Sequence, residues 1–352
     1  MDSHNDQGGR SRGGTSPRLD DVAARAGVST ATVSRCLNTP SKVSEVTRER
    51  VLAAVDALGY APNFGAQALA AKRTNTFGAI IPTMENAIFA RGLQAFQEEL
   101  HLQGVTLLVA SSSYDPELEE QQIRSLVARG ADGLLLIGHD RTPEIYDFLE
   151  TRQVPYVIAW TYDDHESRIS IGFDNRKSMR SLADQVIALG HRSIALITAE
   201  RKDNDRARQR FEGITDAMSA HGLDPAALRV IETSYSISNG GQAFASVMQS
   251  DPRPTAVLCG NDVLAAGALS MARQMGLDVP GDVSITGFDD IEIAQIVTPA
   301  LTTVHVPHHD MGKGAARILL AMRSGERPTF STELEATVVL RESVGPAPNL
   351  ER

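Results

Sequence analysis

The most informative pattern in this chain is a pair of short amphipathic segments separated by a glycine. In the first segment the apolar positions recur from Leu19 to Ala26 at the spacing of one helix face. Gly27 follows, where a helix favours a left-handed residue beyond its C-terminus. Ser29 can cap a second helix that starts near Thr30. The pattern predicts a helix-turn-helix.

The second predicted helix has one apolar and one polar face. Val33 and Leu37 point into a small core, and the residues at the opposite spacing are small or polar. Such a face suits the major groove of DNA, where Arg binds guanine with two hydrogen bonds and hydroxyl groups reach phosphates. The alternative is the solvated face of an ordinary helical hairpin. The residues of the polar face are Thr30, Ala31, Ser34, Arg35 and Asn38.

A third helix and an alanine-rich segment follow. Ser44 can cap the third helix, and Gly59 ends it before Pro62. The segment over 63–73 has the composition of a short helix, but its length and Gly65 make that helix marginal in water. The segment is therefore either a helix that folds against a partner or a plain linker.

From Thr76 onward, apolar runs alternate with segments of helical period. This alternation predicts two doubly wound α/β subdomains. The helices are expected near 88–102, 117–128, 143–151, 178–189, 206–220, 240–249, 262–275 and 311–323. The expected buried parallel strands are FGAIIP, VTLLVA, GLLLIG, YVIAW, SIALIT, AVLCG and VSITGF, with LTTVHV and the last helix crossing back to the first subdomain.

These patterns divide the chain into a small N-terminal module and a large ligand-binding part. The expected segments are a disordered tail (1–17), a helix-turn-helix headpiece (18–60), a hinge helix or linker (61–74), an effector-binding and dimerisation domain (75–345) and a second tail (346–352). Within the large domain, the N-subdomain is expected at about 75–173 and 305–333, and the C-subdomain at about 174–304 and 334–345.

Charge supports the same division. The chain has a net charge of −10, but Arg18 to Arg73 contains eight basic and five acidic residues, so the acidic excess lies beyond this stretch. A weakly basic module on an acidic body suits one face on DNA. No apolar run reaches membrane-spanning length and the first residues lack the apolar core of a signal peptide, which favours a cytoplasmic protein without a membrane partner. Two cysteines, Cys36 and Cys259, do not make a disulfide or metal framework.

The blocks DVAARAGVS, TVSR, TRERV, LGYAPN and AQAL resemble the DNA-binding region of the lactose-repressor/galactose-repressor (LacI/GalR) family of bacterial transcription regulators. The resemblance continues through DGLLL, LGHRSIALI, RQRFEGI, CGNDVLAAGAL, VSITGFDD and TPALTTV in the family's order. It implies that Thr30, Ala31 and Arg35 read bases, that Ser29, Ser34 and Asn38 hold phosphates, and that Leu69 wedges into the minor groove. Gly65 and Gln67 depart from the better helix former and the arginine of many members, which leaves the strength of the hinge helix open.

Candidate ligand contacts come from the ends of predicted strands and the starts of helices. Such ends line the cleft between doubly wound subdomains. Each candidate also has a structural interpretation: Trp160 can simply pack, Arg206 can be solvated, and Asp262 can cap its helix. By resemblance, Arg210, Asn261 and Asp289 fall on the family's effector contacts. The full set is Phe89, Trp160, Arg206, Arg210, Tyr235, Asn261 and Asp289. The second arginine favours a sugar acid or sugar phosphate over a neutral sugar.

Other functional classes fit the sequence less well. His305, His308, His309 and Asp310 follow no zinc spacing, and Asp310 is better placed as a helix cap. With no phosphate-binding glycine loop and no G-x-S-x-G motif, we expect neither cofactor, metal nor enzymatic activity. A sugar-binding transport protein without a DNA role would lack residues 19–69. The sequence therefore predicts a ligand-responsive regulator, favoured as a repressor, that binds a near-palindromic double-stranded DNA operator as a homodimer.

Overall fold

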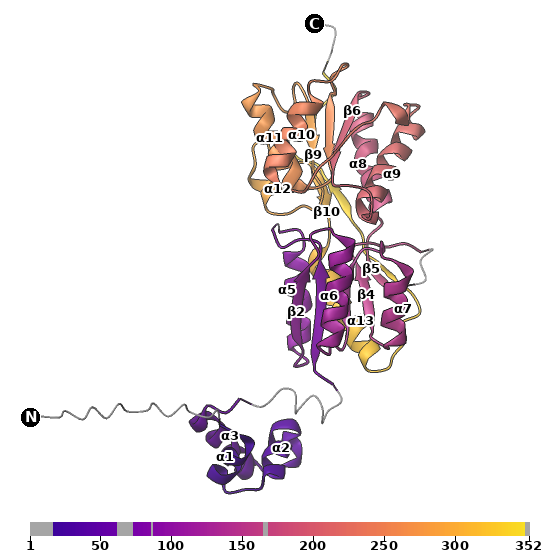
Figure 1. Ribbon diagram of the computed structural model, residues 1–352. Helices are drawn as coiled ribbons and strands as arrows, with labels where there is room; N and C mark the ends of the chain where they lie inside the picture. The colour runs from indigo at the N-terminus through magenta and orange to yellow at the C-terminus, as the bar shows by residue number, and fades with distance from the viewer. Residues whose placement is uncertain (1–16, 62–72, 86, 165–167, 349–352) are drawn as a thin grey trace, which may run out of the picture. The chain divides into compact units, whose positions relative to one another are not determined.

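The computed structural model describes residues 17–61, 73–85, 87–164 and 168–348, and these form two compact units that divide between Thr74 and Asn75 (Figure 1). The smaller unit contains only helical elements within its described part. They are α1 (Leu19–Ala26), α2 (Thr30–Asn38), the 3-10 turn η1 (Pro40–Lys42) and α3 (Glu45–Leu58).

The turn between α1 and α2 has the predicted chemistry. Gly27 has φ +63, a conformation that favours glycine. The hydroxyl of Ser29 accepts a hydrogen bond from the N–H of Thr32 at 3.2 Å, which caps α2. Arg50 on α3 donates to the carbonyl of Ala26 at 2.6 Å and so holds the turn against the third helix. The predicted helix-turn-helix is confirmed.

The cap predicted for the third helix is wrong in detail. Ser44 occupies the N-cap position of α3, but its hydroxyl makes no hydrogen bond to the backbone of the first turn. It instead contacts the hydroxyl of Thr47 at 2.9 Å. The side chain of Thr47 thus competes successfully with the backbone N–H groups for Ser44.

The larger unit is built on two sheets, each with helices on both faces (Figure 1). In the first sheet the strand order is β11-β5-β4-β3-β1-β2. Its strands are β1 (Thr76–Ile81), β2 (Thr106–Ser111), β3 (Leu134–Ile137), β4 (Tyr156–Ala159), β5 (Ser170–Gly172) and β11 (Thr332–Glu333). The helices around it are α5 (Ala90–His101), α6 (Pro116–Ala128), α7 (Pro143–Thr151) and α13 (His308–Arg323). We call this part the first lobe.

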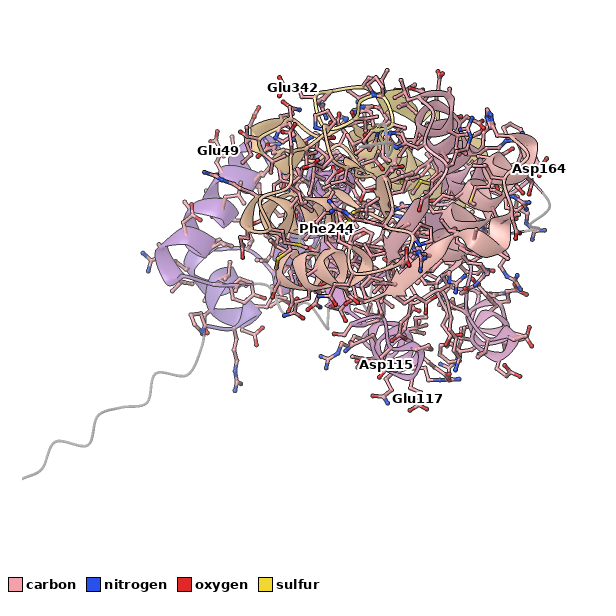
Figure 2. All side chains as sticks on the ribbon, turned by 90° about the horizontal axis from the view of Figure 1, so that it is seen from above. Glu49, Asp115, Glu117, Asp164, Phe244 and Glu342 are labelled. Atoms are coloured by element: carbon pink, nitrogen blue, oxygen red, sulfur yellow. The ribbon has the colours of Figure 1, made fainter. Side chains whose placement is uncertain are left out.

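The second lobe surrounds a four-stranded parallel sheet of order β7-β6-β8-β9. Its strands are β6 (Ile194–Thr198), β7 (Arg229–Glu232), β8 (Ala256–Cys259) and β9 (Ser284–Thr286). The helices are α8 (Asn175–Ala188), α9 (Asp205–Ala220), the 3-10 turn η2 (Pro225–Ala227), α10 (Ile237–Val247), α11 (Asp262–Gln274) and α12 (Ile293–Ile296). Phe244 on α10 is fully buried in the core beneath this sheet (Figure 2).

The two lobes share segments from different parts of the chain. Strand β10 (Thr303–His305) leaves the second lobe and pairs antiparallel with β12 (Thr337–Val339). Between these strands, α13 packs against α5 and β4 of the first lobe. The prediction that the last helix crosses back into the first subdomain is therefore confirmed, and the α/β architecture is as predicted.

Three expectations for these elements need correction. The run VTLLVA forms β2, but this strand is at the edge of its sheet and half exposed rather than buried, with Val109 41% exposed. Asp310 is not a cap, because α13 already begins at His308 and its N-cap is Pro307. Strands β5, β7, β11 and β12 were not predicted, since they are short or contain few apolar residues.

Candidate functional site

A small cavity lies between the lobes, where strands of both sheets end. Its volume is about 20 Å³, which is room for about one water molecule. A larger ligand therefore requires the cavity to widen. The cavity is lined by Ile88, Phe89, Tyr114, Trp160, Asn204, Arg206, Arg210, Tyr235, Asn261 and Asp289. The structure thus brings together all seven ligand contacts that the sequence predicts.

Backbone geometry sets several of these side chains in place. Trp160 directly follows β4 and has φ 63, and Asp289 follows β9 with φ 105. Positive φ is unfavourable for residues other than glycine, and such residues cluster at functional sites. Arg206 and Arg210 lie one turn apart at the start of α9, so both reach the same side of the cleft.

Asp289 is the most unusual group in the cavity. Its side chain is 1% exposed, and neither carboxylate oxygen has a hydrogen-bond partner among the described residues. The nearest cation is Arg210, whose Nη2 lies 3.6 Å from Oδ1. Burial raises the pKa of Asp289 to about 7, against the opposing charges of Arg210 and Arg206. Asp289 can therefore accept hydrogen bonds from a ligand with both carboxylate oxygens.

Arg210 is held firmly by groups other than Asp289. Its Nε donates to Oδ1 of Asn175 at 2.9 Å and its Nη1 donates to the carbonyl of Gly260 at 2.5 Å. The guanidinium also lies 3.7 Å from the centre of the Phe288 ring. A cation fixed in this way can stabilise an anionic or hydroxyl group without reorganising.

Asn261 and Asp262 are neighbours at the start of α11, but only Asn261 has a polar atom left for a ligand. Asn261 caps α11, since its Oδ1 accepts from the N–H of Leu264 at 2.9 Å, but its Nδ2 has no hydrogen-bond partner in the described part of the chain. Asp262 is fully engaged, accepting from Thr303 Oγ1 at 2.6 Å and from the N–H of Ile291 at 2.8 Å. Asn261 therefore offers a donor to the cavity, while Asp262 holds the hinge strand β10.

Aromatic residues form the remaining wall. Phe89 and Trp160 meet edge to face with ring centres 5.3 Å apart, and the Tyr114 and Tyr235 rings are 5.8 Å apart. Burial raises the pKa of both phenols, so each keeps its proton and can donate. The sequence analysis missed Tyr114, Asn204 and Ile88. The signal for Tyr114 was its place directly beyond β2, a position that matches the other strand-end contacts.

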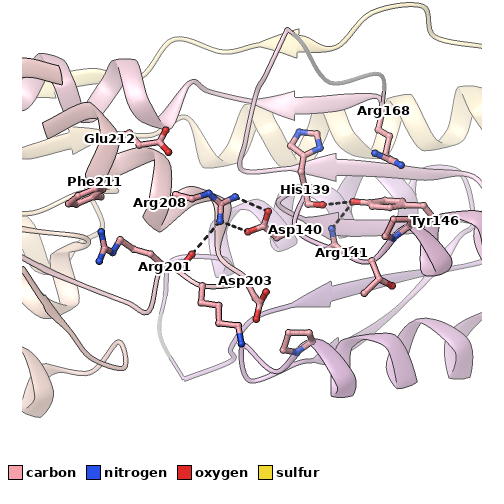
Figure 3. A pocket seen from close by; sticks show the side chains of 14 residues that line it. His139, Asp140, Arg141, Tyr146, Arg168, Arg201, Asp203, Arg208, Phe211 and Glu212 are labelled. Carbon is pink, nitrogen blue, oxygen red and sulfur yellow. Dashed lines mark hydrogen bonds and ion pairs between the residues drawn. The ribbon is translucent and has the colours of Figure 1, made fainter. Parts of the chain in front are cut away.

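A second, more open hollow of about 950 Å³ is lined by residues of both lobes (Figure 3). Here Arg208 of α9 makes two hydrogen bonds of 2.8 Å to the carboxylate of Asp140, which follows β3 in the other lobe. Asp205 accepts from the backbone N–H of His139 at 2.7 Å. Farther away, Arg91 and Glu292 form an ion pair of 3.1 Å between the lobes. These contacts join the two lobes across the cleft.

The DNA-binding residues predicted from the sequence lie on and beside α2. Ser29, Thr30, Ala31 and Arg35 are exposed, and Ser34 is half buried. Asn38 is the last residue of α2. Leu69, together with Gly65 and Gln67, lies outside the described residues. The structure thus places the described members of this set on one short helix and its cap.

The histidine cluster near the start of α13 does not form a metal site. Among the described residues, no group of His, Cys, Asp and Glu side chains is arranged to hold a metal ion. His305 contacts Asp290 at 3.0 Å, while His309 contacts Asp310 at 3.3 Å. No helix in the described ranges is long and apolar enough to cross a membrane.

A helix-turn-helix unit joined to two lobes with a buried polar and aromatic site between them is the architecture of a ligand-responsive DNA-binding regulator. Residues 18–63 match the family "Bacterial regulatory proteins, lacI family", and residues 183–344 match "Periplasmic binding protein-like domain". The chain belongs to the lacI family of transcriptional regulators. A transport protein without a DNA role is set aside, because the family match covers the headpiece.

Individual proteins agree with this assignment over nearly the whole chain. The HTH-type transcriptional regulator GntR of Escherichia coli (strain K12) is 34% identical over 89% of this chain and 94% of its own length. The HTH-type transcriptional repressor PurR of Aliivibrio salmonicida is 33% identical over 93% of this chain and 98% of its own. The lac repressor dimer bound to operator and the anti-inducer ONPF superposes with a TM-score of 0.81, at 29% identity, covering 94% of this chain and 99% of that one.

Proposed function

We propose that this regulator is a cytoplasmic repressor, that it binds a near-palindromic operator as a homodimer, and that a sugar acid in the cleft controls it. The buried carboxylate of Asp289 carries the ligand proposal: neither of its oxygens has a hydrogen-bond partner among the described residues, and a vicinal diol can donate two hydrogen bonds to it. The dimer and the operator are supported by the lac repressor dimer bound to operator.

The other cavity groups suit a hydroxylated ligand with an acid group. Arg206 is 12% exposed, and its Nη1 already contacts Asp205 at 2.7 Å and the carbonyl of Ile137 at 3.2 Å. Its remaining N–H groups can bind a carboxylate. Phe89 and Trp160 offer ring surfaces to the C–H face of a sugar. A CelR–cellobiose complex, 28% identical to this chain with a TM-score of 0.68, supports the sugar class.

The ligand proposal is tested by binding measurements on the full chain. Trp160 is the single tryptophan of the sequence and lines the cavity, so its fluorescence reports directly on occupancy. We expect D-gluconate or D-glucuronate to change this emission and raise the melting temperature more than D-glucose does. A response to D-glucose alone would contradict the acid group, and no response to any of them would contradict the sugar class.

In the proposed DNA complex, Thr30, Ala31 and Arg35 read bases, Ser29, Ser34 and Asn38 hold phosphates, and residues 61–74 form a hinge helix. We expect Leu69→Ala to leave folding and ligand binding intact but to weaken operator binding, since the wedge that holds the DNA bend is lost. Leu69→Met keeps the apolar side chain and is the control. Gel-shift and DNA-bending assays measure the effect. Unchanged bending by the alanine variant would make the segment a linker.

The ion pair between Asp140 and Arg208 gives a prediction about closure. Asp140→Asn should weaken ligand binding by at most about five-fold, because an exposed ion pair contributes about 0.2–1 kcal/mol to the closed state. The loss should shrink in high salt. Asp216→Asn is the matched control, since Asp216 pairs in the same two-bonded way with Arg176 but within one lobe. Equal effects of both variants would show that the Asp140 pair has no special role in closure.

A further inference from the structure

His308 is a buried imidazole that contacts one cavity residue from each lobe. It is 4% exposed and opens helix α13. Its Nδ1 lies 3.1 Å from the indole Nε1 of Trp160, and its Nε2 lies 3.3 Å from the carbonyl oxygen of Asp289. Trp160 follows a strand of the first sheet and Asp289 a strand of the second. His308 itself is not among the residues that line the cavity.

The two partners fix the protonation state of this imidazole. An indole N–H can only donate and a carbonyl oxygen can only accept, so Nδ1 carries the lone pair and Nε2 the proton. Burial lowers the pKa of His308 to about 4, against the favourable contact with the Asp289 carbonyl. Arg91 on α5, His305 on β10 and Arg210 on α9 also face the ring and act in the same direction as burial. The ring is therefore neutral at neutral pH, with both nitrogens in use.

The residues that His308 contacts both have strained backbones. Trp160 and Asp289 have positive φ angles, which persist only where the surroundings hold them. The backbone N–H of Asp289 donates to the carbonyl of Val304 at 2.9 Å, so His308 secures the other side of the same residue. The Trp160 ring is boxed in by Gly92, where a Cβ would come within 2.5 Å of Cη2. Trp160 and Asp289 are thus each held by contacts with several neighbouring residues.

Further polar contacts connect the same residues into a ring around the cavity. Asn175 donates to the carbonyl of Trp160 at 3.1 Å and accepts from Nε of Arg210 at 2.9 Å. Arg210 in turn lies 3.6 Å from Asp289. His308 joins Asp289 back to Trp160 from α13, the helix whose Met311 Sδ also accepts from the backbone N–H of Trp160 at 3.1 Å. Through these two hydrogen bonds, a movement of Trp160 in the first lobe affects the position of Asp289 in the second lobe, and the reverse.

We propose that His308 is a positioning residue for ligand recognition, which fixes the Trp160 ring and the Asp289 carboxylate relative to each other across the cleft. The proposal rests on the proposed function only in taking the cavity as the ligand site. His308 acts without touching the ligand. It holds two side chains of the cavity in place, and this lowers the free-energy cost of ordering them when the ligand binds. Its loss should weaken binding while the cavity-lining residues remain unchanged.

The first test is independent of any ligand. Because the chain has one tryptophan, its nuclear magnetic resonance spectrum contains one indole N–H signal. His308→Phe keeps the ring shape but removes both hydrogen bonds, so this signal should move upfield. His309→Phe is the matched control, since His309 is the next residue and is exposed. An unmoved signal in the His308→Phe protein would overturn the proposal.

The second test measures affinity with D-gluconate, using Trp160 fluorescence. We expect His308→Phe to raise the Kd about tenfold, equivalent to about 1.4 kcal/mol, and His309→Phe to leave it unchanged. If His308→Phe folds poorly, His308→Asn decides: its amide oxygen can replace Nδ1, so the indole signal should stay while affinity falls through the lost Asp289 contact. Wild-type affinity in the folded His308 variants would overturn the proposal.

The two proposals fail in different ways. If the wild-type protein binds neither D-gluconate, D-glucose nor D-glucose 6-phosphate, the proposed ligand class is wrong. The indole signal still decides whether His308 holds Trp160. Conversely, tight D-gluconate binding with an unmoved indole signal in His308→Phe would leave the ligand class standing and remove the role of His308.

Discussion

An Asp289→Asn protein is expected to bind operator as the wild type does, yet to need at least about fivefold more effector for the same response. The amide presents one acceptor oxygen instead of two and no charge, so a ligand that donates to both loses roughly 1–3 kcal/mol of binding free energy. Operator binding measured across an effector titration gives the two midpoints. A midpoint equal to that of the wild type would place the ligand elsewhere.

The same substitution should change the pH dependence in two ways. Wild-type effector affinity should fall as pH drops through about 7, because Asp289 then takes up a proton, whereas the Asn variant should show no such step. Without ligand, the folded wild type retains a proton that the unfolded chain releases above about pH 4, so its stability declines from there to about pH 7. Asp289→Asn removes this decline and should be the more stable protein at pH 8.

Asp290→Asn is the control, one residue farther along the chain. The Asp290 carboxylate is already paired, with Arg341 at 2.6 Å and His305 at 3.0 Å. Its replacement should therefore lower the free energy of unfolding and leave the effector midpoint near that of the wild type. If both variants lose the response equally, the effect comes from distortion of the loop rather than from the Asp289 carboxylate.

The second large effect is expected at Arg35. Replacing this exposed residue of α2 by alanine should weaken specific operator binding by about 1–3 kcal/mol and relax the preference at one base pair of each half-site. The reason is the loss of a guanidinium that can bind guanine with two hydrogen bonds. Titration of labelled operator and its single-base variants measures both quantities.

Arg35→Lys separates base reading from simple charge. Lysine keeps the positive charge but lacks the planar pair of donors, so it should restore binding to non-specific DNA without restoring the base preference. Unchanged discrimination between operator variants in the alanine protein would assign Arg35 to the phosphate backbone instead.

The sequence was sufficient to predict the parts of the sites that depend on local pattern, namely the strand ends and the turn of the helix-turn-helix. Parallel strands end at one edge of a sheet, so Asn261 and Asp289 could be placed near each other from the strand pattern, and Trp160 could be placed at the corresponding edge of the other sheet. The headpiece was equally predictable, because Gly27 and Ser29 have a local chemistry that depends on few neighbours. In both cases the information lies within short stretches of chain.

What could not be predicted depends on contacts between distant segments. His308 reads as one member of a surface-like histidine cluster, and only the packing of α13 against α5 and β4 brings it beside Trp160. Strand β7 has the short sequence RVIE, with charged residues at both ends, and is recognisable only through its pairing with β6. Tyr114 lies in a loop whose direction is set by its own positive φ of 61. His308 and β7 have no local pattern that reveals these contacts, and Tyr114 has only its place shortly beyond β2.

The return of α13 to the first lobe bears on how the protein is made. On the ribosome the chain emerges from its N-terminus, so α5 is complete long before α13 exists. Phe96 and Leu100, which are fully buried in the finished protein, belong to the face of α5 that shares a core with Met311 and Leu319 of α13. The apolar face of α5 therefore stays exposed until the second lobe and then α13 have been synthesised. This interval is the stage at which nascent chains of the regulator are most open to chaperones and to misassembly.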